Sequence, residues 1–169
     1  MKRNILFTGY PGCGKSTLIE KIVKKLGRPA TGFFTREIRE NGQRTGFSIN
    51  TLDGKGGLLA HKDMKGRHRL GKYVVNTEDI DRIAVPSMIP KRANEIVVID
   101  EIGKMECFSP LFRNTLINIL DSNHPVIGSI SLTGNRFINE IKAREDVLVV
   151  RVTEKNRDEL AENYVNRYV

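Results

Sequence analysis

The hydrophobic and polar positions along this chain follow two repeat lengths, which predict alternating strands and helices. Residues 3–8 and 95–100 are short, largely apolar runs of the kind that form buried strands. Residues 15–26 instead place their apolar side chains at helical spacing on one face, and Gly27 is expected to end this helix as a left-handed cap. The chain therefore begins with a strand, a turn and a helix.

The same alternation continues to the C-terminal end. Residues 126–131 and 147–152 read as buried strands, and helices are expected to start after Ser109, Asn135 and Thr153, each of which can act as an N-cap. Thr77 is expected to cap a shorter helix over residues 78–85, which Pro86 and Pro90 limit. Strands that alternate with helices predict an α/β fold, with a mostly parallel sheet, helices on both faces and a ligand at the carboxyl ends of the strands.

One stretch breaks this alternation. Residues 31–39 and 44–51 have strand character and are joined through Asn41-Gly42, a strong hairpin signal, and a second turn leads to a short strand at residues 58–60. These short turns predict an antiparallel β-meander inserted at about residues 31–60 of one domain that covers residues 1–169.

The glycine-rich turn after the first strand carries the most specific chemistry. Residues 9–16 (GYPGCGKS) match the phosphate-loop pattern GxxxxGK[ST] in full, with the required strand before it and helix after it. Glycines let backbone N–H groups close around a polyphosphate, and the helix N-terminus adds its positive end. Lys15 is expected to reach the β- and γ-phosphates and to act in catalysis, and Ser16 is expected to bind Mg²⁺. The chain is therefore predicted to be a P-loop nucleoside triphosphatase.

Two acidic residues end the strand at residues 95–100. Asp100 is expected to hold Mg²⁺, the one cofactor predicted, and Glu101 is expected to polarise a water for in-line attack on the γ-phosphate. Lys104 is a further candidate for a phosphate contact, and Glu106 is expected either to steady Lys104 or to face water. The residues expected to bind the nucleotide are Gly9, Tyr10, Pro11, Gly12, Cys13, Gly14, Lys15, Ser16, Thr17, Asp100, Gly103 and Lys104.

The composition of the chain limits which kinds of partner and location are expected. The 169 residues carry a formal net charge of +8, and residues 62–73 hold five lysines and arginines against one aspartate, which fits either a nucleic-acid partner or an anionic nucleotide. Aromatic residues make up 7% and tryptophan is absent, which argues against base stacking along a single strand. No apolar run approaches the roughly 18 residues of a membrane span, so we expect a cytoplasmic protein.

The two cysteines, Cys13 and Cys107, are far apart in the chain, and neither belongs to a CxxC pair, so a zinc site and a disulfide are not expected. Cys13 lies beside Lys15 and the helix N-terminus. Both favour the thiolate, so Cys13 is expected to be reactive and protected by Mg²⁺-ATP. Cys107 is expected to react without this protection or to be buried.

Beyond the phosphate loop, five further segments carry a family resemblance: residues 31–39 (TGFFTREIR), 44–47 (RTGF), 98–106 (VIDEIGKME), 108–109 (FS) and the TxxNRD run from Thr153. Together they resemble the small nucleoside-triphosphatase family of thermophilic microbes, whose human member is called the cancer-related nucleoside-triphosphatase. The resemblance spans nearly the whole chain. It implies a RecA-like, monomeric or weakly associating, Mg²⁺-dependent enzyme that hydrolyses ATP, GTP, CTP, UTP and TTP alike, and diphosphates less well. The proline-limited segment after Thr77 departs from the family, whose helix there is longer.

Three other activities fit parts of the sequence. A P-loop kinase would use residues 62–73 as a lid, and an ATP-dependent switch that binds nucleic acid would use the net charge. A GTP-binding switch is less favoured, because DEIG fits its DxxG motif but no NKxD motif follows. No arginine finger can be assigned among Arg136, Arg151 and Arg157.

Overall fold

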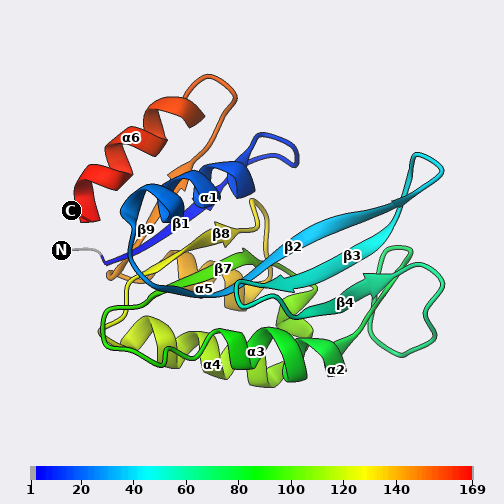
Figure 1. Ribbon diagram of the computed structural model, residues 1–169. Helices are drawn as coiled ribbons and strands as arrows, with labels where there is room; N and C mark the ends of the chain where they lie inside the picture. The colour runs from blue at the N-terminus through cyan, green and yellow to red at the C-terminus, as the bar shows by residue number, and fades with distance from the viewer. Residues whose placement is uncertain (1–2, 169) are drawn as a thin grey trace.

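One nine-stranded sheet runs through the computed structural model, which describes residues 3–168 (Figure 1). Across the sheet the strands follow the order β5-β6-β4-β3-β2-β7-β8-β1-β9. Their bounds are β1 Asn4–Thr8, β2 Ala30–Glu40, β3 Gln43–Thr51, β4 Gly56–His61, β5 Arg69–Leu70, β6 Tyr73–Val75, β7 Ile96–Ile102, β8 Val126–Ile130 and β9 Val147–Arg151. The helices are α1 Lys15–Leu26, α2 Thr77–Asp79, α3 Val85–Ser87, α4 Pro110–Asp121, α5 Arg136–Lys142 and α6 Arg157–Tyr168.

The sheet is mixed, which corrects the expectation of a mostly parallel one. Among the described residues, β2, β7, β8, β1 and β9 pair in parallel, and every pair on the other side of β2 is antiparallel. The meander is therefore an extension of the same sheet, and β2 belongs to both halves. Its N-terminal part pairs with β7 as far as Phe34, and its C-terminal part pairs with β3 alone.

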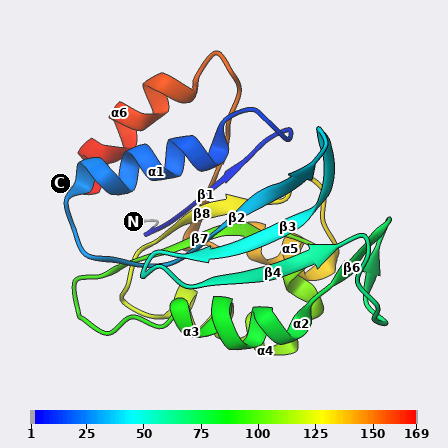
Figure 2. The ribbon, with the colours of Figure 1, turned by 45° about the vertical axis from the view of Figure 1, so that its right-hand side comes forward.

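Helices cover both faces of the sheet, as expected for the α/β fold (Figure 2). On one face α1 and α6 pack over Ile5 and Phe7 of β1. On the other face α4, α5 and the segment from α2 to α3 pack over Leu6 of β1 and Val97 of β7. Because neighbouring residues of a buried strand point to opposite faces, each central strand feeds two cores.

Most helix ends were predicted correctly, because they depend on neighbouring residues. Gly27 adopts the left-handed conformation after α1 (φ 59°), and the side chains of Ser109 and Asn135 accept N-cap hydrogen bonds from Phe112 and Ile138. Before α6, Thr153 and Asn156 exchange side-chain-to-backbone hydrogen bonds.

The segment around Pro86 differs from the prediction in two ways. Asn76, and not Thr77, caps α2, because its side-chain oxygen accepts from the backbone N–H of Asp79 (3.2 Å). Helical structure then continues through a π-helical turn at Ile80–Ala84 and restarts at Val85, so Pro86 lies in the first turn of α3, where proline is tolerated. The helical segment therefore extends to Ser87.

The basic segment at residues 62–73 also holds structure that its sequence did not predict. Arg69–Leu70 and Tyr73–Val75 form the hairpin of β5 and β6, which closes the outer edge of the sheet against β4. Among the described residues no helix is long and apolar enough to cross a membrane.

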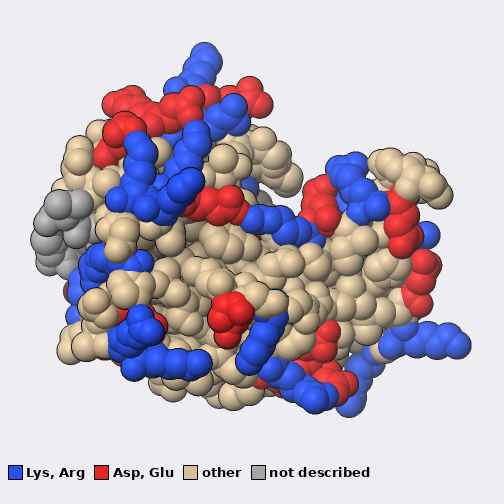
Figure 3. Space-filling view, viewed as in Figure 1, with Lys and Arg blue, Asp and Glu red and all other residues tan. Residues whose placement is uncertain are grey.

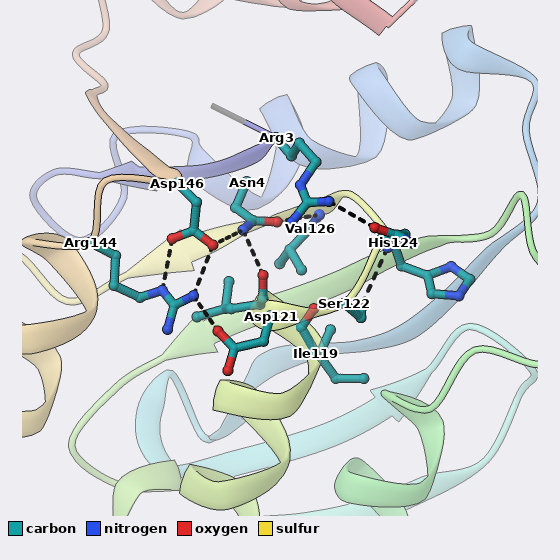
Figure 4. A network of polar contacts seen from close by, with 11 residues as sticks. Arg3, Asn4, Ile119, Asp121, Ser122, His124, Val126, Arg144 and Asp146 are labelled. Carbon is teal, nitrogen blue, oxygen red and sulfur yellow. Dashed lines mark hydrogen bonds and ion pairs between the residues drawn. The ribbon is translucent and has the colours of Figure 1, made fainter. Parts of the chain in front are cut away.

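At the edge of the sheet where the parallel strands begin, a polar network joins four elements (Figure 4). The buried Asn4 side chain donates to Asp146 and to the carbonyl of Leu120, and it accepts from the N–H of Val126. Arg144 donates to both carboxylate oxygens of Asp146 (2.8 Å each). These bonds fix the starts of β1, β8 and β9 relative to the end of α4.

Candidate active site

An open cleft lies at the carboxyl ends of the parallel strands, where the α/β pattern predicted the ligand. Its volume is about 790 Å³, and its walls come from the loop after β1, the end of β7, the residues after β8 and the meander. Figure 3 shows the surface hollowed between the part that contains α1 and the projecting β2–β3 hairpin. The cleft is within the usual size range of small-molecule sites.

The phosphate loop has the backbone shape that its glycines were expected to permit. Gly12 and Gly14 have positive φ values of 78° and 98°, a region that other residues rarely adopt. At Gly9 a side chain would collide with the carbonyl oxygen of Val152, because a Cβ there would lie 2.6 Å from it. The loop therefore requires glycine at each of these three positions.

Lys15 is folded back over this loop. Its Nζ donates to the carbonyl oxygens of Gly9 (2.9 Å) and Tyr10 (3.1 Å), and its side chain lines the cleft. The ammonium group is thus held in the mouth of the loop, where an anion would replace these carbonyls as its partner.

Asp100 receives hydrogen bonds from two hydroxyls at the floor of the cleft. Ser16 Oγ donates to its Oδ2 (2.5 Å) and Ser129 Oγ, from β8, donates to its Oδ1 (2.5 Å). Asp100 is only 3% exposed, and this burial raises the pKa of its carboxyl, against the opposing effect of the two hydroxyls. Ser129 was missed by the sequence, since no motif marks it.

Glu101 also lines the cleft, next to Asp100 on β7. Burial raises the pKa of Glu101 first, and the nearby charge of Asp100 raises it further, whereas Lys15 and a hydrogen bond from Ser131 act in the opposite direction. A carboxyl with a raised pKa accepts a proton more readily at neutral pH, as a general base must.

Glu106 has neither of the roles expected for it. It is only 3% exposed where it lines the cleft, and its Oε2 accepts from the backbone N–H of Gly103 (3.1 Å), so it is largely shielded from water and does not hold Lys104. Burial raises the pKa of Glu106 well above its usual value, and the charge of Glu101 adds to the effect. Lys104 is exposed at the cleft and makes no hydrogen bond or ion pair within residues 3–168.

Ten of the twelve residues expected to bind the nucleotide line the cleft, and the exceptions are Cys13 and Gly103. Cys13 is 8% exposed and its side chain packs in the core under α1 and α6, with Sγ 3.9 Å from Lys15 Nζ, so its burial opposes the reactivity expected for it. Only the backbone of Cys13 remains available to a phosphate. Cys107 is buried as well, which together with the charge of Glu106 raises the pKa of its thiol to about 12.

None of the three arginines considered as fingers lines the cleft. Arg136 pairs with Glu140 and Arg151 lies over the ring of Tyr10 at 5.0 Å. The arginines that do line it are Arg36 and Arg44, on β2 and β3. The sequence placed both on the meander, but the face they occupy depends on the register of the sheet, which no local pattern reveals.

A smaller pocket of about 230 Å³ adjoins the other side of the loop. It lies between α1 and α6, and Arg157 and Lys21 form part of its wall. Gly14 and Thr17 line both this pocket and the large cleft, so the two spaces meet at the start of α1.

The oxygen donors at Ser16 and Asp100 fit magnesium. Within residues 3–168 no group of three or more His, Cys, Asp or Glu side chains is placed to hold a metal ion. Magnesium does not need such a cage, because it usually keeps several waters and takes one or two protein oxygens beside the substrate phosphates. A hydroxyl and a carboxylate 2.5 Å apart at the mouth of a phosphate loop match that requirement.

Comparisons with known proteins agree over nearly the full chain. The nucleoside-triphosphatase THEP1 of Thermotoga sp. (strain RQ2) is 45% identical, with 92% of this chain and 90% of that relative covered. The mouse cancer-related nucleoside-triphosphatase homolog is 37% identical, with 98% and 96% covered. The crystal structure of THEP1 from Aquifex aeolicus superposes with a TM-score of 0.89 at 35% identity, with 98% of both chains covered. The family model described as NTPase matches residues 4–165, and the chain belongs to this NTPase family.

Proposed function

We propose that this protein is a Mg²⁺-dependent nucleoside-triphosphate phosphohydrolase with the RecA-like P-loop fold and broad base specificity. The observation that carries the proposal is the 2.5 Å contact between Ser16 Oγ and Asp100 Oδ2, which joins the phosphate loop to the acidic end of β7. That contact brings the two expected magnesium ligands together beside Glu101. The names of the relatives, all nucleoside-triphosphatases, support the same activity.

Each residue of the site then has a defined task. The loop amides and Lys15 bind the β- and γ-phosphates, and Lys15 exchanges its carbonyl partners for phosphate oxygens. Ser16 and Asp100 would hold Mg²⁺, which when bound neutralises part of the phosphate charge. Glu101 accepts a proton from the attacking water. Phosphate is released and the nucleoside diphosphate remains on the loop.

The smaller pocket supports weak selection among the bases. A ligand whose terminal phosphates lie at Lys15 and Asp100 places its α-phosphate toward Thr17, so its nucleoside extends toward Arg157. Lys21 and Asp158 there form an ion pair with side chains 52% and 79% exposed, and such long exposed chains adapt to different base edges. We therefore infer that ATP, GTP, CTP, UTP and TTP are all substrates. Diphosphates, which place no γ-phosphate before Glu101, are weaker ones.

Phosphate release from a panel of nucleotides, with and without Mg²⁺, tests this proposal. We expect turnover of all five triphosphates in Mg²⁺ and little in its absence. The base selectivity is refuted if one triphosphate exceeds the others more than roughly 100-fold in kcat/KM, a difference of about 2.7 kcal/mol. Phosphate release that is equally fast in excess chelator would refute the role of magnesium.

A further inference from the structure

The cleft is wider than the phosphate loop requires. In the strand order β3-β2-β7-β8-β1, β7 lies two strands from β1 and two strands from β3. At about 4.8 Å per strand, the floor extends roughly 10 Å on each side of β7. The half between β1 and β7 contains Lys15, Ser16 and Asp100. The other half has the meander as its wall, and we call it the meander half of the cleft.

Apolar and cationic side chains share the wall of the meander half. The apolar surface comes from Phe47 on β3, Leu59 on β4, Leu70 on β5 and Met105 after β7. Arg36 and Arg44 supply the positive charge. An apolar surface with a few fixed polar groups is the usual composition of a small-molecule site, and guanidinium groups match carboxylates and phosphates.

Arg44 is held in place by its neighbours. Its guanidinium lies 5.2 Å from the ring centroid of Phe47 and 5.8 Å from that of Tyr73. Its Nε donates to Tyr73 Oη (2.9 Å) and its Nη1 to Glu37 Oε1 (3.2 Å). Nη2 makes no hydrogen bond to any described residue, and the side chain is 41% exposed. The guanidinium is thus oriented in advance, with one nitrogen left for a ligand.

Arg36 lies opposite the loop on β2. Its guanidinium stacks over the ring of Phe34 at 5.1 Å and pairs with Glu20 of α1. The Glu37 carboxylate is shared between Arg39 and Arg44, so it offsets part of the charge of this wall. Because Arg36 is already paired with Glu20, the free Nη2 of Arg44 is the group in the meander half that is left for an anion.

The nucleotide itself does not fill this half. In the binding mode proposed above, its nucleoside extends from Thr17 toward the smaller pocket, which residues of α1 and α6 line. Its terminal phosphate ends near Asp100 and Glu101. The meander half therefore adjoins the terminal phosphate but not the base, and a second molecule can occupy it while the nucleotide is bound.

We propose that the meander half binds a second ligand, an organic anion with a flat apolar body and a phosphate or carboxylate group, at the same time as the nucleotide. The apolar body packs against Phe47, Leu59 and Leu70, and the anionic group pairs with Arg44. The proposal depends on the proposed function only for the position of the nucleotide on the phosphate loop, and it does not require that hydrolysis be fast.

The test is calorimetric titration of α-naphthyl phosphate into the protein saturated with Mg²⁺ and the non-hydrolysable analogue adenylyl imidodiphosphate. We expect α-naphthyl phosphate to bind in this loaded state. Inorganic phosphate, which lacks the apolar body, and neutral α-naphthol, which lacks the anionic group, are expected to bind much more weakly. Replacing the phosphate by a carboxylate, as in α-naphthoate, distinguishes the two anionic groups.

Two arginine variants provide the specificity test. Arg44→Gln is expected to weaken α-naphthyl phosphate binding about tenfold or more, the usual effect of losing a charged hydrogen bond. Arg69→Gln removes the charge of an exposed arginine on β5 that does not line the cleft and does not contact Glu37, and it is expected to leave the affinity unchanged. The affinity of each variant for the nucleotide analogue reports whether the fold is intact.

Three results would overturn the proposal: no binding to the loaded protein, displacement of α-naphthyl phosphate by the nucleotide analogue, or equal affinity in both arginine variants. Displacement would mean that the probe occupies only the phosphate loop. A protein that binds the probe in the loaded state yet releases no phosphate from any triphosphate would contradict the proposed function and leave this second site standing.

Discussion

Ser16 and Asp100 are 84 residues apart in the chain, and their side chains meet at 2.5 Å between Oγ and Oδ2. The first stands at the start of α1 and the second near the end of β7, so this bond measures how closely the phosphate loop and the acidic strand approach. In the proposed mechanism the activity depends on that approach, because Ser16 and Asp100 would hold Mg²⁺ together.

Lys15→Ala is expected to lose nucleotide affinity and activity together. The ammonium group balances phosphate charge in both the ground state and the transition state, and it also holds the loop through two carbonyls. Calorimetry with Mg²⁺-ATP measures the affinity. Lys24→Ala, an exposed lysine on the same helix, is the control, and a Lys15 variant that binds as tightly as this control would remove the assigned role.

Glu101→Gln is expected to keep nucleotide binding and to lower kcat by roughly 10²–10⁴, the usual contribution of a general base. The amide has nearly the same shape but cannot accept the proton of the water. Single-turnover phosphate release and equilibrium binding, measured on the same preparation, separate the two effects. A kcat within about threefold of the unaltered enzyme is incompatible with this role for Glu101.

Ser129→Ala tests a residue that no motif indicated. Its hydroxyl orients Asp100 without touching the loop, so its loss is expected to weaken the apparent Mg²⁺ affinity by about 10–100-fold, as the loss of groups that support metal ligands does. The measurement is the Mg²⁺ dependence of phosphate release. Ser48→Ala, on β3, is the comparison, and identical Mg²⁺ curves for the two variants would exclude the positioning role.

Asp146→Asn is expected to lower the free energy of unfolding by roughly 1–2 kcal/mol near neutral pH, the range for charged hydrogen bonds near a surface. The hydrogen bonds from Arg144 hold the pKa of Asp146 below its usual value, despite some burial. A pKa that is lower in the folded state stabilises the protein above the unfolded pKa of about 3.9, and this stabilisation is lost as the pH falls through the folded value. Urea unfolding measured across the acid range should show that the difference in free energy of unfolding between the unaltered protein and Asp146→Asn becomes smaller as the pH falls. Asp63→Asn serves as the control. A difference that stays constant as the pH falls contradicts the linkage.

Maleimide labelling tests the position of the cysteines. Since both thiols are buried, we expect Cys13 and Cys107 to react far more slowly in the folded protein than in urea, and Mg²⁺-ATP to add little protection. Mass analysis of the labelled peptides assigns each adduct. Fast labelling of Cys13 that Mg²⁺-ATP blocks would instead place its thiol at the surface of the cleft.

The parts that the sequence predicted well depend on residues close together in the chain. The phosphate loop, the cap at Gly27 and the N-cap at Asn135 each follow from a few adjacent residues with a fixed conformational need. The position of Asp100 and Glu101 in the cleft could be predicted because the phosphate loop had already indicated the end of the sheet at which the ligand is expected.

The parts that were missed depend on how distant segments pack. Cys13 lies in the motif, but whether its thiol faces the cleft or the core is decided by Val152 and the helices that cover it. The burial of Glu106 and the cleft-facing position of Arg44 likewise result from tertiary packing and sheet register, so local periodicity could not show them.

The length of β2 has a consequence for how this enzyme can change. Residues 35–40 run past the last pairing with β7, so within the sheet they pair with β3 alone, and the ion pair of Arg36 with Glu20 joins them to α1. Insertions, deletions or new side chains in that overhanging hairpin would alter the wall of the cleft without changing the residues of the phosphate loop. The architecture thus lets natural selection reshape what lies beyond the terminal phosphate while the hydrolytic chemistry stays fixed.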